Sequence, residues 1–243
     1  MNWYFTLLFS TCFSPSFIAT NTGNSKDRIR NIPLPYGYKR IEFPERSFAE
    51  WLRNIRLKPG KTVYLYNGFP KKNQTAQFAV LDIPVGKKDL QQCADAVMRL
   101  RASYLFDNKR MNEIIFYDNS NKAYRYTGGE NIQHFENYLE KVFAFCGTAS
   151  LEKQLKKKPV QDIAPGDVLI KGGYPGHAVI VMDIGVKSNG EKIYLLAQSY
   201  MPAQDIHILK NNQDELLNPW YAVSGSQIIT PEWIFQSTQL YGW

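Results

Sequence analysis

The chain has 243 residues, of which 44% are hydrophobic and 14% aromatic, enough for a packed core in one large domain or two small ones. Charged residues make up 21%, and this balance excludes an intrinsically disordered chain. The formal net charge of +7 favours an anionic partner, such as an acidic polymer of a cell envelope. Lysine and arginine are scattered without a recognition helix or an RNA-binding motif, so nucleic acid is not an expected partner.

The N-terminus is similar to the core of a signal peptide. An apolar, aromatic run covers residues 3–19 and is followed by a polar stretch. The run is too short, and too interrupted by Pro15, to span a membrane as a stable helix. We therefore expect a leader over residues 1–20 and one α+β domain over residues 21–243, exported to the periplasm or envelope, with no membrane span after leader removal. Lipidation of Cys12 is the weaker alternative.

Apolar periodicity predicts a helix-rich first half and a strand-rich second half. Helices are expected over residues 47–55, 89–105, 132–145 and 150–158, with a closing helical turn from residue 231. Strands are expected over residues 62–66, 77–83, 113–118, 168–170, 178–184, 192–199 and 205–211. The later strands form an antiparallel meander in this scheme. The pattern is α+β, without the alternation of βαβ units.

Cys93 lies near the start of the strongest predicted helix. Asp89 is a plausible N-cap of that helix and Gln92 its third residue. Free backbone N–H groups and the positive end of the helix dipole favour a thiolate at this place, which is the nucleophile of cysteine acyl transfer. Cys93 also lies on the apolar stripe of the helix, and as a small buried hydrophobe it would have no chemical role.

His177 is the candidate base. It follows a glycine-rich loop over residues 171–176 and opens the β-branched run 178–184. A histidine at the mouth of a rigid strand is well placed to meet a ligand. The alternative is a half-buried histidine that caps a strand.

Gln198 is the candidate for the third residue, which orients the imidazole. If the strands on either side of residues 185–190 form a hairpin, the register that keeps one face wholly apolar places Gln198 opposite His177 and Lys192 opposite Asp183. The amide oxygen of Gln198 would then accept a hydrogen bond from a ring N–H. An exposed glutamine at a strand end is the alternative.

A helix-start cysteine, a histidine that opens a strand and a polar residue on the next strand resemble papain-like cell-wall hydrolases of the NlpC and CHAP types. In those families a strand beginning Gly-Asp precedes the histidine strand, as "GDVLI" precedes "GHAVIVMDI" here. The resemblance implies a papain-like core, in which a central antiparallel sheet packs against the helix bearing Cys93 and residues 106–158 form a helical insertion. It implies Cys93 as nucleophile, His177 as base and Gln198 as third residue, cutting peptide amides of peptidoglycan without a cofactor or metal.

From about residue 32 onward the chain also closely resembles an uncharacterised family of exported bacterial proteins. The segments "DLQQCADAVMRLRA", "PGHAVIV", "LAQSYMPAQDIHIL" and "NPWY" carry this resemblance. That family has no established activity, so it implies none for this chain.

Three classes of function stay open at this point. In the first, a cysteine-dependent amide hydrolase, Gln92, Tyr200, Trp220 and Tyr221 are candidate substrate-binding residues, although aromatic residues near turns also serve as core lids. The second class is a non-catalytic envelope protein that binds a glycan or peptide on the same scaffold. The third is an envelope structural protein with a disulfide between Cys93 and Cys146.

Overall fold

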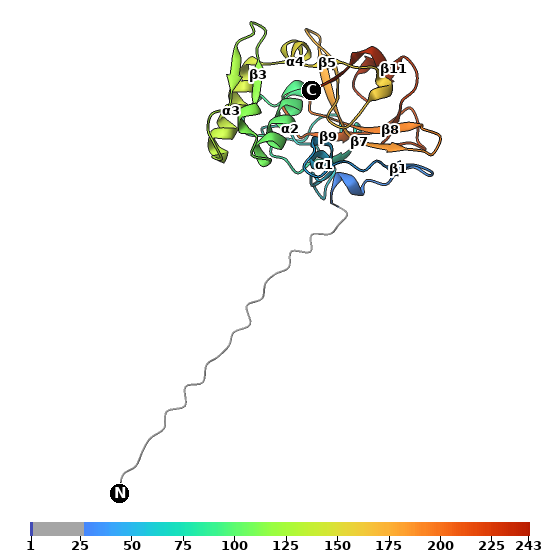
Figure 1. The fold of residues 1–243 in the computed structure, drawn as a ribbon, viewed down its shortest axis with the longest axis horizontal. Coiled ribbons are helices and arrows are strands. Elements are labelled where there is room, and N and C mark those ends of the chain that lie inside the picture. Colours follow the sequence, from blue (N-terminus) through green and yellow to red (C-terminus); the bar gives the residue numbers. More distant parts are fainter. Residues whose placement is uncertain (2–26) are drawn as a thin grey trace.

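The computed structural model describes Met1 and residues 27–243, so Cys12 and almost all of the expected leader lie outside the described residues. The helices are α1 (Phe48–Arg53), α2 (Cys93–Asp107), α3 (Ile132–Phe145) and α4 (Thr148–Gln154) (Figure 1). The strands are β1 (Lys39–Arg40), β2 (Gln77–Val80), β3 (Ile115–Tyr117), β4 (Ala123–Arg125), β5 (Lys156–Lys157), β6 (Val168–Lys171), β7 (His177–Val186), β8 (Lys192–Gln198), β9 (His207–Leu209), β10 (Tyr221–Ala222), β11 (Gln227–Ile229), β12 (Ile234–Gln236) and β13 (Leu240–Gly242).

The fold is mixed α+β and is built around a nine-stranded sheet, which confirms the expected class. The strands follow the order β2-β9-β8-β7-β6-β13-β5, while β1 pairs with β7 and β10 with β8. Every pairing in this sheet is antiparallel. The run from β6 to β9 is the meander expected from the sequence, and β7 lies at its centre.

Strand β7 is buried on both faces, which explains why its sequence is continuously apolar. Ile180 and Met182 belong to the core cluster that includes the apolar side chains of α2. Val179 and Val181, which alternate with them, belong to a second cluster that contains Phe235 of β12. Because side chains alternate along a strand, a strand covered on both faces needs an apolar residue at nearly every position.

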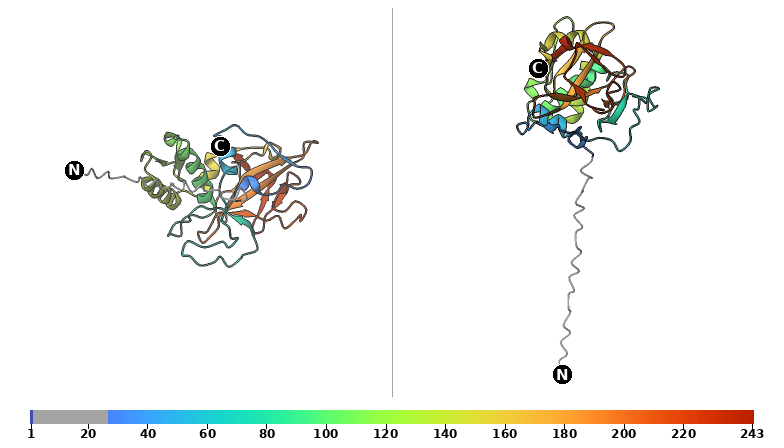
Figure 2. Two further views of the ribbon diagram at one scale, coloured as in Figure 1. Left: turned by 90° about the horizontal axis from the view of Figure 1, so that it is seen from below. Right: turned by 90° about the vertical axis from the view of Figure 1, so that its right-hand side faces the viewer.

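Helices α1 and α2 pack on the large sheet, whereas α3 lies apart from it. Helix α3 and the β3–β4 hairpin lie together at one side, and the large sheet lies at the other, with α2 between them (Figures 1 and 2). Residues 106–158 contain β3, β4, α3 and α4. Within residues 27–243, no helix is long and apolar enough to cross a membrane.

Three local predictions are wrong. Residues 62–66 form no named strand but only isolated bridges, one of them between Tyr64 and Pro70, where proline has no N–H to extend a ladder. The basic helix expected over 150–158 ends at Gln154, and Lys156–Lys157 pairs with β13 as β5. The closing segment is a β11–β12 hairpin, a short 3-10 turn and β13, because Ile228 and Phe235 face each other across the hairpin and pack on the sheet.

Candidate active site

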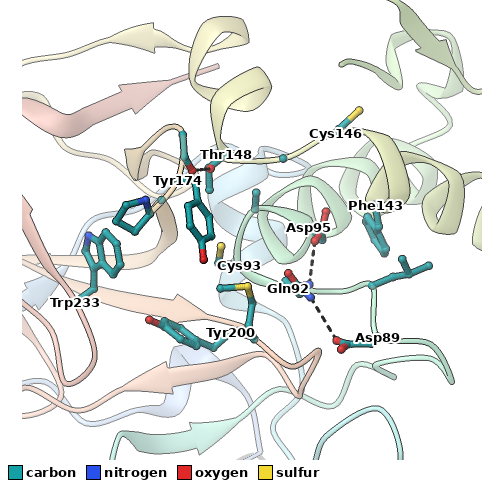
Figure 3. A pocket seen from close by; sticks show the side chains of 17 residues that line it. Asp89, Gln92, Cys93, Asp95, Phe143, Cys146, Thr148, Tyr174, Tyr200 and Trp233 are labelled. Atoms are coloured by element: carbon teal, nitrogen blue, oxygen red, sulfur yellow. Dashed lines mark hydrogen bonds between the residues drawn. The ribbon is translucent and has the colours of Figure 1, made fainter. Parts of the chain in front are cut away.

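A cavity of about 380 Å³ opens at the N-terminal end of α2 (Figure 3). Its walls come from that helix start, the loop between β6 and β7, the connection from α3 to α4 and the segment after β8. The residues that matter for its chemistry are Gln92, Cys93, Asp95, Cys146, Tyr200 and Trp233. Part of one wall, including Cys146, therefore comes from the segment 106–158.

Cys93 is the first residue of α2, so the helix begins later than the sequence pattern indicates. Gln92 is the N-cap, and its backbone N–H donates to Oδ2 of Asp95 at 3.0 Å. Asp89 does not cap the helix but holds the preceding loop, because its Oδ1 accepts from Ala203 N at 2.6 Å and from Gln92 Nε2 at 3.3 Å. This shift places the backbone N–H of Cys93 among the helix-start groups that have no intrahelical partner.

Cys93 is only 9% exposed, and its thiol meets the backbone of Ala178 at the start of β7. Burial, together with the charge of Asp95, raises the pKa of its thiol to about 11, although hydrogen bonding by the backbone amide of Ala178 opposes the shift. The thiolate expected from the helix start is therefore not the resting form, because desolvation outweighs the helix dipole at this depth. Ala178 directly follows His177, which puts the thiol at the histidine end of β7.

Two further titratable groups line the same cavity. Burial raises the pKa of Asp95 to about 8, and its Oδ1 has no hydrogen-bond partner among the described residues. Burial also raises the pKa of Cys146. Cys93 and Cys146 are both free thiols in the structure, so the proposed disulfide between them is not formed in it.

His177 and Gln198 meet, although the predicted register is wrong. Ile180 pairs with Ala197, two positions away from the expected pairing, so Gln198 lies diagonally across from His177. A shift of two residues preserves the face on which each side chain lies. His177 Nε2 is therefore still 2.9 Å from Gln198 Oε1. An amide oxygen only accepts hydrogen bonds, so Nε2 carries the proton and Nδ1 keeps its lone pair.

The register changes again toward the other end of β7. A bulge between Val181 and Asp183 places Asp183 opposite Leu195 and not opposite Lys192 as predicted. Asp183 consequently meets two guanidinium groups, Arg53 of α1 at 2.6 Å and Arg40 of β1 at 2.7 Å. An extra residue in one strand turns the following side chains to the opposite face, which alternation along a regular strand does not anticipate.

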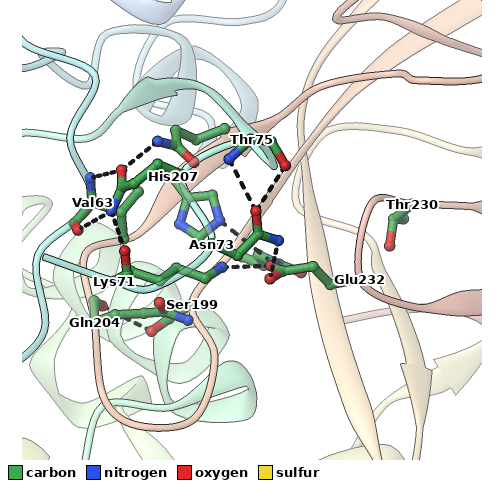
Figure 4. A network of polar contacts seen from close by, with 12 residues as sticks. Val63, Lys71, Asn73, Thr75, Ser199, Gln204, His207, Thr230 and Glu232 are labelled. Carbon is green, nitrogen blue, oxygen red and sulfur yellow. Dashed lines mark hydrogen bonds and ion pairs between the residues drawn. The ribbon is translucent and has the colours of Figure 1, made fainter.

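A polar network behind Gln198 was missed by sequence reasoning (Figure 4). Gln198 Nε2 lies 2.6 Å from Glu232 Oε2 and 3.4 Å from Nε2 of the buried His207. The other bonds of Glu232 go to Lys71 at 2.6 Å and to Asn73 at 2.9 Å. Glu232 lies in the segment expected to be helical, and no spacing in the sequence connects it with β8.

Aromatic rings enclose His177, which is 1% exposed. Ring centroids of Tyr200, Trp233 and Phe235 lie 4.7, 5.3 and 5.8 Å from that of the imidazole. Burial lowers the pKa of His177 to about 4, so the ring is neutral at physiological pH. Tyr200 and Trp233 also line the Cys93 cavity and thus separate the imidazole from bulk water.

Of the four candidate substrate-binding residues, Gln92 and Tyr200 line the cavity. Trp220 does not, because it is completely buried and its indole N–H donates to Pro33 O at 2.8 Å. Tyr221 is also buried, where its ring stacks on Tyr194 and its hydroxyl donates to the carbonyl of Lys210. Both residues belong to the buried core, which is the alternative left open for aromatic residues near turns.

Within the described part of the chain, no three His, Cys, Asp or Glu side chains gather in a way that would hold a metal ion. The side chains that line the cavity supply a buried thiol and an aromatic wall, and the neutral imidazole of His177, with its fixed tautomer, packs against Tyr200 and Trp233 of that wall. A nucleophile, a proton acceptor and an orienting amide are the three parts required for covalent acyl transfer.

A family model described as a domain of unknown function (4846) matches residues 29–131 and, in an overlapping second segment, residues 119–241. No curated protein matches the chain. No solved structure matches it either.

Proposed function

The chain belongs to the family of the domain of unknown function 4846, and we propose that it is a cysteine-dependent amide hydrolase with Cys93 as nucleophile, His177 as base and Gln198 as orienting residue. One observation carries the proposal. His177 donates through Nε2 to Gln198, which leaves Nδ1 as its proton acceptor, and the backbone amide of the next residue in β7, Ala178, hydrogen-bonds the Cys93 thiol.

The proposed reaction starts from a neutral pair. His177 Nδ1 takes the thiol proton as Cys93 Sγ attacks the carbonyl carbon, and a C–S bond forms. The oxyanion of the tetrahedral intermediate lies near the backbone N–H of Cys93 at the positive end of α2. The imidazolium then gives its proton to the leaving nitrogen, and the C–N bond breaks. Water, deprotonated by His177, hydrolyses the thioester and restores the thiol.

The high pKa of Cys93 favours concerted proton removal over a resting ion pair. With the thiol pKa near 11 and the imidazole pKa near 4, the neutral pair is the stable form across the physiological range. Activation therefore depends on a base placed to receive the proton as the bond forms, which makes the orientation of His177 decisive. The proposed papain-like arrangement of helix, histidine strand and neighbouring strand supplies that orientation.

The proposed substrate is a cell-wall peptide or a related amide in the envelope. The net charge of +7 supports an anionic polymer as the partner, and the proposed export would bring the chain to it. The aromatic side chains of Tyr200 and Trp233 at the cavity supply flat surfaces for a peptide or sugar. The segment 106–158, as the proposed insertion into the papain-like core, contributes the wall that contains Cys146.

The direct test is digestion of purified peptidoglycan by the wild type, by Cys93→Ala and by Cys146→Ala. Cys146 is the matched control because it is a second buried, free thiol at the same cavity. Mass spectrometry of soluble fragments should show new amine and carboxyl ends with the wild type and with Cys146→Ala, but not with Cys93→Ala. Equal product from the wild type and Cys93→Ala would refute Cys93 as the nucleophile.

A non-catalytic binding protein on the same scaffold is the second candidate, favoured by the raised thiol pKa and the aromatic cavity wall. Co-sedimentation with peptidoglycan separates the two. Binding by the wild type and Cys93→Ala alike, with no new chain ends released by either, would favour the binding protein.

A further inference from the structure

Glu232 determines the orientation of the Gln198 amide by binding the end of the amide that does not contact His177. A carboxylate oxygen only accepts hydrogen bonds, so the group 2.6 Å from Glu232 Oε2 must be the –NH₂ of Gln198. The amide oxygen then has to face His177, where Oε1 lies 2.9 Å from Nε2. The proton on His177 Nε2 thus follows from the position of an acidic residue that does not touch the imidazole through any hydrogen bond in the structure.

His207 favours the same orientation of the Gln198 amide. Its Nδ1 lies 2.9 Å from the carbonyl oxygen of Asp205, which only accepts, so Nδ1 carries the proton. Its Nε2 is left as an acceptor 3.4 Å from Gln198 Nε2. Both N–H bonds of the Gln198 amide therefore point at acceptors, and a half-turn of the amide would place its oxygen against a carboxylate and an imidazole lone pair.

Glu232 keeps its charge because of the groups around it. Burial opposes its ionisation, but the Lys71 ammonium and the Asn73 amide hold the pKa of the carboxyl below its usual range. Figure 4 shows Lys71 and Asn73 converging on Glu232. The side chains of the pair are 9% and 13% exposed, so water competes little for the carboxylate.

We propose that Glu232 is a positioning residue of the site, which fixes the Nε2–H tautomer of His177 by holding the Gln198 amide in one orientation. The proposal rests on the proposed function for its catalytic meaning, since only that tautomer leaves Nδ1 free to take the thiol proton. Without an acceptor at residue 232, only the longer 3.4 Å contact with His207 Nε2 opposes rotation of the amide, which can then offer its –NH₂ to His177 Nε2. His177 then changes to the Nδ1–H tautomer, which cannot act as the base.

The test is the tautomer of His177, read from its ring ¹⁵N chemical shifts by NMR on the full chain. Lys71→Met combined with Glu232→Met removes the acceptor without leaving a buried, unpaired ammonium, since an ion pair replaced by apolar side chains of similar size is often tolerated. We expect this double variant to populate the Nδ1–H tautomer and to lose about 10- to 100-fold in amide hydrolysis. Glu232→Gln retains an acceptor oxygen for Gln198 and is expected to keep the Nε2–H tautomer.

The control is Glu50→Gln, which removes a partly buried carboxylate, 21% exposed and paired with Arg30, from α1, the helix that binds β7 at Asp183. It should leave the tautomer unchanged. A folded double variant with the wild-type tautomer would overturn the proposal. If the double variant does not fold, exchange of the Gln198 side-chain protons in the wild type decides: slow exchange of both supports the proposal, and exchange as fast as that of exposed glutamines overturns it.

The tautomer is measured without substrate, so this inference and the proposed function can fail separately. A tautomer change in the double variant, in a protein whose wild type hydrolyses no amide, supports the positioning role and counts against the hydrolase alone. A wild-type hydrolase whose double variant keeps both the tautomer and the activity counts against the positioning role alone.

Discussion

The two ends of β7 each bury a polar side chain, but they satisfy it differently. At one end, both carboxylate oxygens of Asp183 are bound by guanidinium groups, from Arg53 and Arg40. At the other end, His177 has a partner for Nε2 in Gln198, and Nδ1 has no partner among the described residues. A closed network holds elements together, whereas a network with one open lone pair can exchange a proton. The comparison separates what stabilises this strand from what would react on it.

The largest expected effect lies at the open end. We predict that His177→Ala lowers amide hydrolysis by about 10²- to 10⁴-fold, the usual contribution of a general base. Progress curves on peptidoglycan peptides measure this, with thermal unfolding recorded in parallel because the imidazole packs on three aromatic rings. His134→Ala, on the exposed face of α3, is the control and should retain activity. Retained hydrolysis in a folded His177→Ala variant would contradict the assignment.

A substitution at Asp183, in the closed network, should change the stability of the fold and not the rate of hydrolysis. Asp183→Ala leaves two guanidinium groups without their shared partner, Arg53 being 3% exposed, and should lower the free energy of unfolding by about 3–5 kcal/mol. Urea denaturation measures the loss. Glu191→Gln, which breaks the exposed pair with Lys187 beyond the end of the same strand, should cost less than about 1 kcal/mol. Equal losses in the free energy of unfolding would show that the buried network contributes no more stability than the exposed ion pair.

The loop before His177 connects the two kinds of effect. A Cβ on Gly176 would lie 2.3 Å from Gly173 O and 2.8 Å from Lys171 O, both backbone atoms that cannot move aside cheaply. Gly176→Ala should therefore cost about 1–3 kcal/mol through overpacking and should displace His177. Gly147→Ala, at a cavity-lining glycine with open space around its Cβ, is the control. A Gly176→Ala variant with wild-type stability and activity would argue against a tightly held loop.

The smallest expected effect is an absence of pH dependence near neutrality. Hydrolysis needs the neutral imidazole, so the rate should rise with pH through the His177 pKa of about 4 and stay within about twofold between pH 6 and 8. An imidazole with the ordinary pKa of about 6.5 would lose roughly fourfold at pH 6. Initial rates in buffers of constant ionic strength distinguish the two. An acid limb near pH 6.5 would show that His177 is wetter than its burial indicates.

Much of the sheet is predictable from the sequence because its strands are apolar runs bounded by turns. Strand β8 and helix α3 begin at the residues that the pattern indicates, and Ser47, the first residue of the helix expected over 47–55, caps α1 by accepting a hydrogen bond from Glu50 N. Edge elements such as β5 and β12 were not predicted as strands, because two or three residues carry no periodicity. Strand β5 pairs with β13, which lies far along the chain, and β12 pairs with the equally short β11 just before it.

At the site, the local sequence pattern identified the three candidate residues but not the surrounding groups that orient and desolvate them. Cys93 and His177 stand at the start of a helix and of a strand, and such boundaries are written in nearby residues. The pairing of Gln198 with His177 was found despite a wrong register, because an even shift keeps side chains on the same face. Glu232 reaches Gln198 across 34 positions, and desolvation of Cys93 depends on the whole surrounding fold. Neither has a local signal.

The bulge between Val181 and Asp183 has a practical consequence for anyone who wishes to graft this site. On the N-terminal side of the bulge, pairing with β6 and with the end of β8 determines which face of the sheet each side chain occupies. On its C-terminal side, the hairpin turn and β1 determine this. A grafted segment of β7 that ends before the bulge keeps the regular alternation of side chains that contains His177. A transplant that cuts after it, into a regular host strand, would turn His177 toward the wrong side of the host sheet.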